Sequence, residues 1–237
     1  MATKGSNHSA ARRSQAQTTR RSVIEAAGRL FVERGYEPTS IDEIAEEAGV
    51  SRATVFTAVG GKPVLLKTAF DVAVVGDDEP VSLPERPKSR AARQEPDAGR
   101  YLALYAEILT EVGGRVASIH EVVRSAASAD PDARYLWENH RAQRHLAAGG
   151  VVRDVREKGG RLREGLDAEA AADIVWILND PGLYHQLVHE REWKPERFQA
   201  WLADTLLRQL LRDAVTRPAA EEPAAAETAT PRPSRRG

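Results

Sequence analysis

The stretch GVSRATVFTAVGGKPVLL, Gly49 to Leu66, decides the fold because it carries the signals of a turn and of two helix starts. Gly49 ends one helix, and Ser51 caps the next helix only two residues later. A connection this short makes the two helices cross rather than run antiparallel. Gly60-Gly61 closes the second of them, and a further helix is predicted from about Lys62.

Upstream of this turn, the sequence predicts two more helices. The first begins at about Thr18 and ends at Arg34-Gly35, with apolar residues at helical spacing between these points. The second is shorter: Ser40 caps it, and Glu43, three residues later, completes a capping box. We therefore predict three small helices and a fourth that leads into the rest of the chain.

The helix after the turn is predicted to present one side to a partner. Val50 and Val55 point inward, which leaves Arg52, Ala53, Thr54, Phe56 and Thr57 outward. A helix-turn-helix sets the start of its second helix into the major groove, where arginine bonds guanine and apolar groups touch the thymine methyl. Four residues are of the right type for phosphate oxygens: Ser40, Thr54, Thr57 and Lys62. The capped helix starts at Ser40 and Ser51 add backbone amides that face an anion.

Composition agrees with a helical globular protein. The 237 residues are 41% hydrophobic and 29% charged, and they contain no cysteine, which excludes disulfides, thiolate metal sites and cysteine nucleophiles. No apolar run approaches the roughly 20 residues that cross a bilayer. The expected location is therefore the cytoplasm, and no membrane partner is expected.

Charge and local composition divide the chain unevenly. Residues 1–70 carry a net charge of +3, although the whole chain carries −1, which suits a polyanionic partner. Residues 1–17 have no apolar period and are predicted to be a disordered basic arm. Residues 76–97 hold four prolines and are predicted to be a loop, and residues 214–237 are predicted to be a disordered tail rich in alanine and proline.

Two segments resemble one known family. RLFVERGYEPTSIDEIAEEAGVSRATVF, residues 29–56, with the Lys-Pro-Val-Leu-Leu that follows at 62–66, resembles the DNA-binding domain of TetR-family transcriptional regulators. Asp173–Leu206 resembles the dimerisation region of such proteins. The resemblance implies a homodimeric all-α protein of about nine helices without enzymatic activity or cofactor. Residues 18–61 would form the helix-turn-helix domain, and residues 62–213 the connecting helix and a ligand-binding and dimerisation domain.

The resemblance also implies roles for single residues. Positions matching Arg52, Ala53 and Phe56 commonly face bases in the family, and those matching Ser40, Thr54, Thr57 and Lys62 commonly face phosphates. This chain departs from the family at Phe56, which is usually tyrosine, at Ala58-Val59, usually His-Phe, and at Pro63, usually glutamate. Losing the phenol and the imidazole predicts weaker binding to DNA of any sequence.

The predicted basic arm offers one way to offset that loss. It would follow phosphates or enter the minor groove with four arginines, Arg12, Arg13, Arg20 and Arg21. The alternative is a solvated tail without contact to DNA.

Two further sets of residues are candidates for the rest of the molecule. An apolar stripe on the last helix, with residues near 174–178, suits a twofold four-helix bundle. The candidate dimer residues are Ile174, Leu178, Phe198, Trp201, Leu202, Thr205, Leu206 and Leu210. The candidate ligand-pocket residues are aromatic or titratable groups on the central helices: Tyr101, Tyr105, His120, Trp137, His140, Trp176 and Tyr184.

The sequence thus favours a sequence-specific transcriptional regulator that a small molecule releases from duplex DNA, with repression as the family's usual outcome. One alternative is a helical adaptor that has kept the fold and lost DNA binding. A second is a metal-binding enzyme, because His185 and His189 lie four residues apart with Glu190 adjacent. No third ligand, HExxH order or glycine-rich phosphate loop accompanies these residues, so no metal site is predicted.

Overall fold

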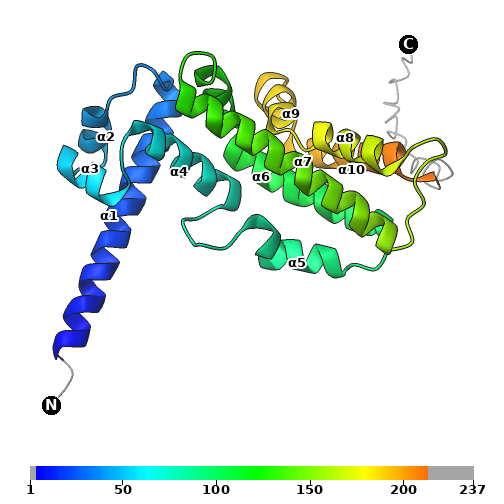
Figure 1. Ribbon diagram of the computed structural model, residues 1–237, viewed down its shortest axis with the longest axis horizontal. Helices are drawn as coiled ribbons and strands as arrows, with labels where there is room; N and C mark the ends of the chain where they lie inside the picture. Colours follow the sequence, from blue (N-terminus) through cyan, green and yellow to red (C-terminus); the bar gives the residue numbers. More distant parts are fainter. Residues whose placement is uncertain (1–3, 213–237) are drawn as a thin grey trace, which may run out of the picture.

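The computed structural model describes residues 4–212, and over that range the protein is all-α (Figure 1). Residues 4–212 contain ten α-helices where about nine were expected, and the only bridge between extended residues within this range joins Leu162 and Leu211. The predicted tail at 214–237 and the first three residues of the predicted arm lie outside the described residues.

The N-terminal helices are α1 (Lys4–Arg34), α2 (Ile41–Glu47) and α3 (Arg52–Ala58). Their shared core is formed by side chains with almost no exposed surface: Val23, Ala27, Phe31, Ile44 and Val55. The capping box predicted at Ser40 is present, since its side chain accepts from Glu43 N and Glu43 returns to the Ser40 backbone. Ser51 caps α3 in the same way by accepting from Thr54 N.

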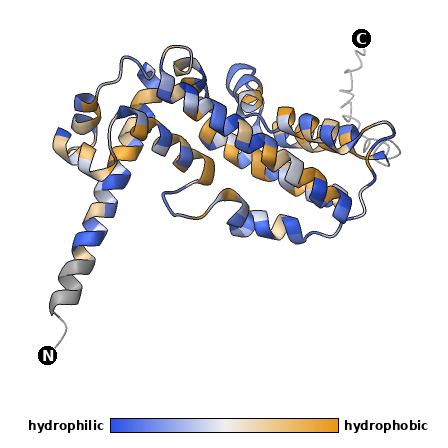
Figure 2. Cartoon of the chain, viewed as in Figure 1, coloured by the Kyte–Doolittle hydropathy of each residue, from blue (hydrophilic) through white to orange (hydrophobic). Residues whose placement is uncertain are grey.

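Helix α1 differs from the sequence expectation, because it begins at Lys4 rather than near Thr18. Residues 4–17 therefore do not form the predicted disordered arm. The added stretch contains no proline, and it is rich in alanine, glutamine and arginine, which favour helix. Once the buried turns from Val23 onward have formed, each further residue extends the helix at low cost. In Figure 1 this part of α1 projects away from the body, and Figure 2 shows few strongly hydrophobic residues along its coloured part.

Helix α4 (Lys62–Val75) joins the N-terminal helices to the larger body. Pro63 lies in its first turn, and Leu65, Leu66 and Phe70 are buried on its inner side. It packs against both α1 and α6. Its end is held by Arg115 of α6, whose Nε and Nη2 donate to Ala73 O at 3.1 Å and Val74 O at 3.2 Å.

The larger body is arranged around one long central helix. Helix α6 (Ala98–Ala126) packs against the other long helix, α7 (Pro131–Glu157), against α10 (Pro195–Leu210), and against α4, α5 and α9. Helix α8 (Ala168–Leu178) packs on α7, and after it the short α9 (Pro181–Tyr184) continues into a π-helix, η2 (His185–Glu190). Figure 2 shows hydrophobic residues concentrated along α6 where these helices cover it.

The stretch 76–97 corrects a second expectation. In place of a loop, it contains the 3-10 turn η1 (Leu83–Glu85) and helix α5 (Pro87–Gln94). Two of the four prolines that suggested a loop, Pro84 and Pro87, stand in the first turns of these two elements, where a missing amide costs nothing. Ala92 of α5 is buried, and α5 packs on α6 as a cover over the body.

Candidate DNA-binding surface and ligand cavity

The turn between α2 and α3 fixes which side of α3 faces outward. Gly49 adopts φ of 66°, a left-handed conformation that glycine takes without strain, and Val50 N bonds back to Ala45 O at 2.9 Å. Val55 is fully buried against α1 and α2. The opposite side of α3 carries four exposed residues, Arg52, Ala53, Phe56 and Thr57. Thr54 on the same helix is half-buried. The predicted outward surface is therefore what α3 presents to solvent.

Arg52 has two neighbours on that surface. Its Nη1 donates to Asp42 Oδ2 at 2.7 Å, and its Cζ lies 5.6 Å from the centre of the Phe56 ring. Because both partners of the ion pair are largely exposed, the pair contributes little stability and exchanges readily for another acceptor. Asp42 and Phe56 nevertheless hold the guanidinium over the start of α3.

The predicted phosphate-binding side chains already have partners within the protein. Ser40 Oγ donates to Glu43 Oε2 at 2.8 Å, and Ser51 Oγ shares a 2.8 Å hydrogen bond with Thr54 Oγ1. Thr57 Oγ1 donates to Ala53 O at 2.7 Å. Ser40, Thr57 and one member of the Ser51–Thr54 pair must therefore turn the hydroxyl proton away from its present acceptor before it can donate to a phosphate.

Lys62 is also engaged, because its ammonium bridges to the loop that precedes α2. Its Nζ donates to Glu37 O at 2.9 Å and lies 4.5 Å from the centre of the Tyr36 ring. Burial and nearby carboxylates raise the pKa of Tyr36 to about 12, so its hydroxyl stays protonated. Lys62 therefore has a structural role in addition to any contact with DNA.

The four arginines of the predicted arm separate into two pairs. Arg12 and Arg13 are exposed on the projecting part of α1. Arg20 instead donates to Ala58 O at 2.9 Å and to Asp78 at 2.6 Å, and Arg21 donates to Glu25 at 2.8 Å. A hollow of about 530 Å³ lies between α1 and α3 and is lined by Arg12, Gln15, Ala16, Gln17, Thr19, Arg20, Thr54, Thr57 and Ala58. Arg12 and Arg20 thus share this hollow with α3, and Arg20 is already engaged with Ala58 and Asp78.

A second hollow lies inside the larger body. It has a volume of about 510 Å³ and is enclosed by α4, η1, α5, α6, α7 and the residues after α8. Most of its lining is apolar: Val74, Leu83, Pro84, Ala92, Ile108, Leu109, Val112, Val116, Leu146, Ala147, Val151 and Pro181. Its polar lining is Ser89, Arg93, Tyr101, Tyr105, His140, Arg144, Arg153, Asp154 and Asn179. This size and composition are typical of a small-molecule site.

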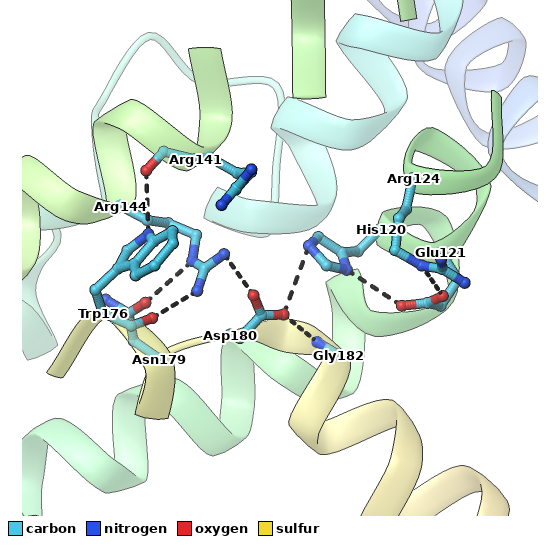
Figure 3. A network of polar contacts seen from close by, with 9 residues as sticks. All are labelled: His120, Glu121, Arg124, Arg141, Arg144, Trp176, Asn179, Asp180 and Gly182. Carbon is cyan, nitrogen blue, oxygen red and sulfur yellow. Dashed lines mark hydrogen bonds and ion pairs between the residues drawn. The ribbon is translucent and has the colours of Figure 1, made fainter. Parts of the chain in front are cut away.

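Arg144 is the centre of a polar network at the wall of this cavity (Figure 3). Its side chain is only 8% exposed, and its three nitrogens donate to Asn179 Oδ1 at 3.0 Å, Asp180 Oδ2 at 2.8 Å and Trp176 O at 2.7 Å. The network joins α7 to the end of α8 and the start of α9. Nothing in the sequence pattern singled out Arg144, because a lone arginine on a long helix is normally exposed.

Asp180 also contacts His120, and His140 lies beside His120. Their rings are 5.8 Å apart, and Asp180 Oδ1 lies 3.8 Å from His120 Nε2 (Figure 3). Burial lowers the pKa of both histidines, with Arg144 adding to the effect, and the pKa of His140 falls to about 3. Both rings are therefore neutral near pH 7, and His140 Nε2 has no hydrogen-bond partner within residues 4–212.

The seven predicted pocket residues divide into groups. Tyr101, Tyr105 and His140 line the cavity. His120 and Trp137 pack against each other with their rings tilted by 52° and their centres 4.9 Å apart, and neither lines the cavity.

The other two pocket candidates lie elsewhere and correct the expectation. Trp176 packs beneath the guanidinium groups of Arg141 and Arg144, with Nε1 donating to Arg141 O. Tyr184 packs between Phe198 and the bare backbone of Gly113 on α6, where its ring supports α10 rather than a ligand.

The eight predicted dimer residues also divide. The structure gives four of them another role, because Phe198, Leu202, Leu206 and Leu210 are at most 2% exposed and form the side of α10 that packs on α6. A helical stripe shows that residues are buried, but it does not show against which partner. The other four, Ile174, Leu178, Trp201 and Thr205, are half-buried on α8 and α10. Beside them on α8 lies Ile177, which is 57% exposed and was not among the candidates.

The residues considered for a metal do not gather enough ligands. His185 and His189 have ring centres 5.3 Å apart on η2, and Glu190 Oε1 lies 3.6 Å from His185 Nε2. Within the described part of the chain, no group of three or more histidine or acidic side chains has the geometry to hold a metal ion. In residues 4–212, no helix combines the length and apolar character needed to span a membrane.

Comparison with known proteins shows which family the N-terminal helices are similar to. Residues 23–68, which span α1 to α4, match the family described as bacterial regulatory proteins, tetR family. The chain is 28% identical over 158 residues to the HTH-type transcriptional regulator YdeS of Bacillus subtilis, which covers 67% of this chain and 74% of that protein.

Solved structures of similar fold extend over the larger body as well. NalD, the secondary repressor of the MexAB-OprM multidrug efflux pump in Pseudomonas aeruginosa, aligns with a TM-score of 0.62 at 22% identity, over 84% of this chain and 99% of its own. A transcriptional regulator from Saccharomonospora viridis in complex with choline aligns with a TM-score of 0.60 at 20% identity, over 81% and 97%. At these identities the likeness shows a shared fold.

Proposed function

We propose that this chain, which belongs to the TetR family of helix-turn-helix DNA-binding transcriptional regulators, is a homodimeric repressor that a small molecule releases from its operator. The family is not enzymatic, and such a regulator works in the cytoplasm, where its operator DNA is. The observation that carries the proposal is the exposed side of α3, where Arg52 lies free of the core beside Phe56. An exposed arginine at the start of a recognition helix bonds guanine through two donors.

The cavity supports the second half of the proposal. Val74, near the end of α4, forms part of its wall, and α4 packs directly on α1 of the DNA-binding domain. A ligand that displaces this wall changes the angle between α4 and the body. In a dimer, that change alters the separation of the two recognition helices, which must lie about 34–36 Å apart to enter successive major grooves. The choline bound to the Saccharomonospora viridis regulator is a precedent for a ligand in this fold.

The open side of α8 and α10 supports the homodimer. These helices pack against each other in the protomer and leave Ile174, Ile177, Leu178, Trp201 and Thr205 partly or largely uncovered. Two copies of such a pair form a four-helix bundle around a twofold axis. Trp201 and Ile177 are the largest apolar groups available to that bundle.

Two substitutions test the DNA-reading role. Arg52→Ala removes a base contact, so it should weaken binding to an operator duplex by about 1–3 kcal/mol and leave binding to a shuffled duplex nearly unchanged. Lys62→Ala should weaken binding to both duplexes alike, because a phosphate contact carries no sequence information. Fluorescence anisotropy at fixed salt measures both effects, and thermal unfolding shows whether the loss of the Lys62 contacts to Glu37 and Tyr36 disturbs the fold.

The same experiment separates the repressor from a helical adaptor. An adaptor would bind both duplexes weakly, and Arg52→Ala would change nothing. A single-subunit species in gel filtration, together with binding that ignores sequence, would contradict a specific dimeric repressor.

A further inference from the structure

The residues that line the cavity indicate which chemical class of ligand it binds, and this inference rests on the proposal that a small molecule acts there. Four contacts between the elements that enclose the cavity mark its course. Tyr101 OH donates to Asp154 Oδ2 at 3.0 Å at one end, and Arg144 and Tyr105 meet Asn179 in the middle. At the other end His140 packs edge-on against Phe70, with ring centres 4.6 Å apart. The space therefore runs along α6 from the exposed arginines toward α4.

The deep part of the cavity, around Arg144 and His140, holds no unbalanced charge, and the one carboxylate of the lining, Asp154, lies at the Tyr101 end, where it accepts from Tyr101 OH. Arg144, the buried cation in its wall, is paired with Asp180, and its other nitrogens donate to neutral oxygens. His140 is neutral because burial holds its pKa near 3. An ionised ligand group placed here would give up its hydration without gaining an opposite charge, which is strongly unfavourable. The free cations of the lining, Arg93 and Arg153, lie at the exposed end.

Two polar groups in the interior remain available. Tyr105 OH accepts from Asn179 Nδ2 at 3.3 Å, and its own proton has no acceptor among residues 4–212. His140 Nε2 is buried without a partner within the same range. Burial raises the pKa of Tyr105, so the phenol keeps this proton. Tyr105 is half-buried, and a ligand that fills the cavity cuts its donor off from solvent, so a ligand oxygen at this point is needed to keep the donor satisfied.

The aromatic wall favours a flat molecule. The rings of Tyr101 and Tyr105 lie nearly parallel, with an angle of 27° and centres 6.5 Å apart, and both side chains line the cavity. Aliphatic side chains of α6 and α7, among them Ile108, Leu109 and Val151, complete the walls. An aromatic ring system stacks on such a pair and excludes water from the aliphatic side.

We propose that the cavity binds a neutral, mainly apolar aromatic molecule that carries one hydrogen-bond-accepting oxygen, and that Tyr105 donates to that oxygen. The site discriminates against carboxylates and against cationic amines of the same size. Discrimination arises because a charged substituent placed beside Tyr105 loses its hydration where the nearest charge, Arg144, is already paired with Asp180.

The test uses four probes that share one ring system and differ at a single substituent. They are 2-acetylnaphthalene, 2-ethylnaphthalene, 2-naphthoate and 2-naphthylmethylammonium, each titrated into the full-length protein by calorimetry. We expect 2-acetylnaphthalene to bind best and the two charged probes to bind at least tenfold more weakly. Tyr105→Phe keeps the ring and removes the donor, so it should weaken 2-acetylnaphthalene by about fivefold and leave 2-ethylnaphthalene unchanged.

Two further variants test whether the probes bind inside the cavity. Leu109→Trp fills the cavity and should abolish binding of every probe. Leu146→Ala changes a lining residue that is 76% exposed and should leave the order of affinities unchanged. Thermal unfolding of each variant shows that the fold is kept.

Three results would overturn the ligand class: no binding of 2-acetylnaphthalene, tighter binding of either charged probe, or an equal loss for both neutral probes on Tyr105→Phe. Release of DNA is measured separately by anisotropy. Probe binding without release would support the ligand class and contradict the release step of the proposed function.

Discussion

Phe56 is the residue of α3 at which the resemblance to the family leads us to expect a tyrosine. Its ring is 48% exposed, beside the Arg52 guanidinium. A phenol at this position would carry its hydroxyl beyond the ring edge into the surrounding solvent. The chain therefore presents an apolar ring where a tyrosine would present a hydrogen-bond donor.

Phe56→Tyr should tighten binding to any duplex by about 1 kcal/mol, since one neutral hydrogen bond to a phosphate is gained. Salt dependence should not change, because the added hydroxyl carries no charge and releases no counterion. Anisotropy titrations at two salt concentrations measure both quantities. Equal affinity of the parent and the variant would mean that the hydroxyl does not reach a phosphate.

At the level of single elements, α6 depends on a glycine for its contact with α9. A Cβ at Gly113 would lie 2.7 Å from ring atoms of Tyr184, closer than atoms can pack, and Tyr184 itself is held by Phe198 of α10. Gly149, in the middle of α7, has nothing within 4 Å of the same position. The two glycines are a matched pair in helices of similar length.

Gly113→Ala should lower the free energy of unfolding by about 1–3 kcal/mol, because the methyl group overpacks the Tyr184 site. Gly149→Ala should raise it by about 0.5–1 kcal/mol, since alanine favours helix and meets no obstacle. Denaturant unfolding of both variants against the parent measures the difference. The account of this contact is wrong if both substitutions change stability in the same direction.

The helix-turn-helix could be predicted from the sequence because its signals are local. The capping box at Ser40, the left-handed Gly49 and the cap at Ser51 each determine the backbone within a few residues. The start of α1 and the existence of α5 could not be predicted in this way. Residues 4–17 lack an apolar period, and the prolines of 83–94 permit either a loop or a helix start.

The sites of the larger body were predicted less well, for a different physical reason. The hydrogen-bond partners of Arg144 lie at 176–180, more than thirty residues away in the sequence. No local sequence pattern predicts contacts over that separation. The stripe of Phe198, Leu202 and Leu206 correctly indicated burial, but burial against α6 and burial against a second subunit require the same pattern. Exposure in the folded protomer distinguishes the two cases, and the 57% exposure of Ile177 makes it a candidate that the stripe did not include.

At the scale of the whole molecule, the buried histidines link stability to pH. His140 keeps its pKa near 3 in the fold and has an ordinary value of about 6.5 when unfolded. A group whose folded pKa is lowered contributes stability above its unfolded pKa, and that contribution is lost as the pH falls toward the folded pKa. The window is therefore pH 6.5 down to about 3, and His120 acts in the same direction.

His140→Leu should accordingly flatten the acid limb of the stability curve, with about 2 kcal/mol less loss than the parent between pH 7 and 4.5. His145→Leu is the comparison variant, because it removes a half-exposed imidazole from the same helix. Urea unfolding at half-unit pH intervals gives both curves. Parallel curves for His140→Leu and the parent would rule out the buried neutral imidazole as the cause.

The proposed dimer makes a prediction at Ile177. Ile177→Glu places a charge in the apolar face of α8 and should convert the dimer to a monomer, while leaving the helical content unchanged. Tyr135→Glu is the control, since that side chain is 73% exposed on α7, away from the proposed interface. Analytical ultracentrifugation measures the mass of each species. A dimer that survives Ile177→Glu would place the interface on another surface.

The most direct test of the central claim is selection of bound duplexes from a random pool by the full-length protein. A dimer that reads DNA with α3 should enrich an inverted repeat, with a guanine in each half-site for Arg52 and half-site centres about 10–10.5 base pairs, or a multiple of that, apart. Enrichment of a single unpaired half-site, or of no sequence at all, would contradict the claim that this protein is a sequence-specific dimeric repressor.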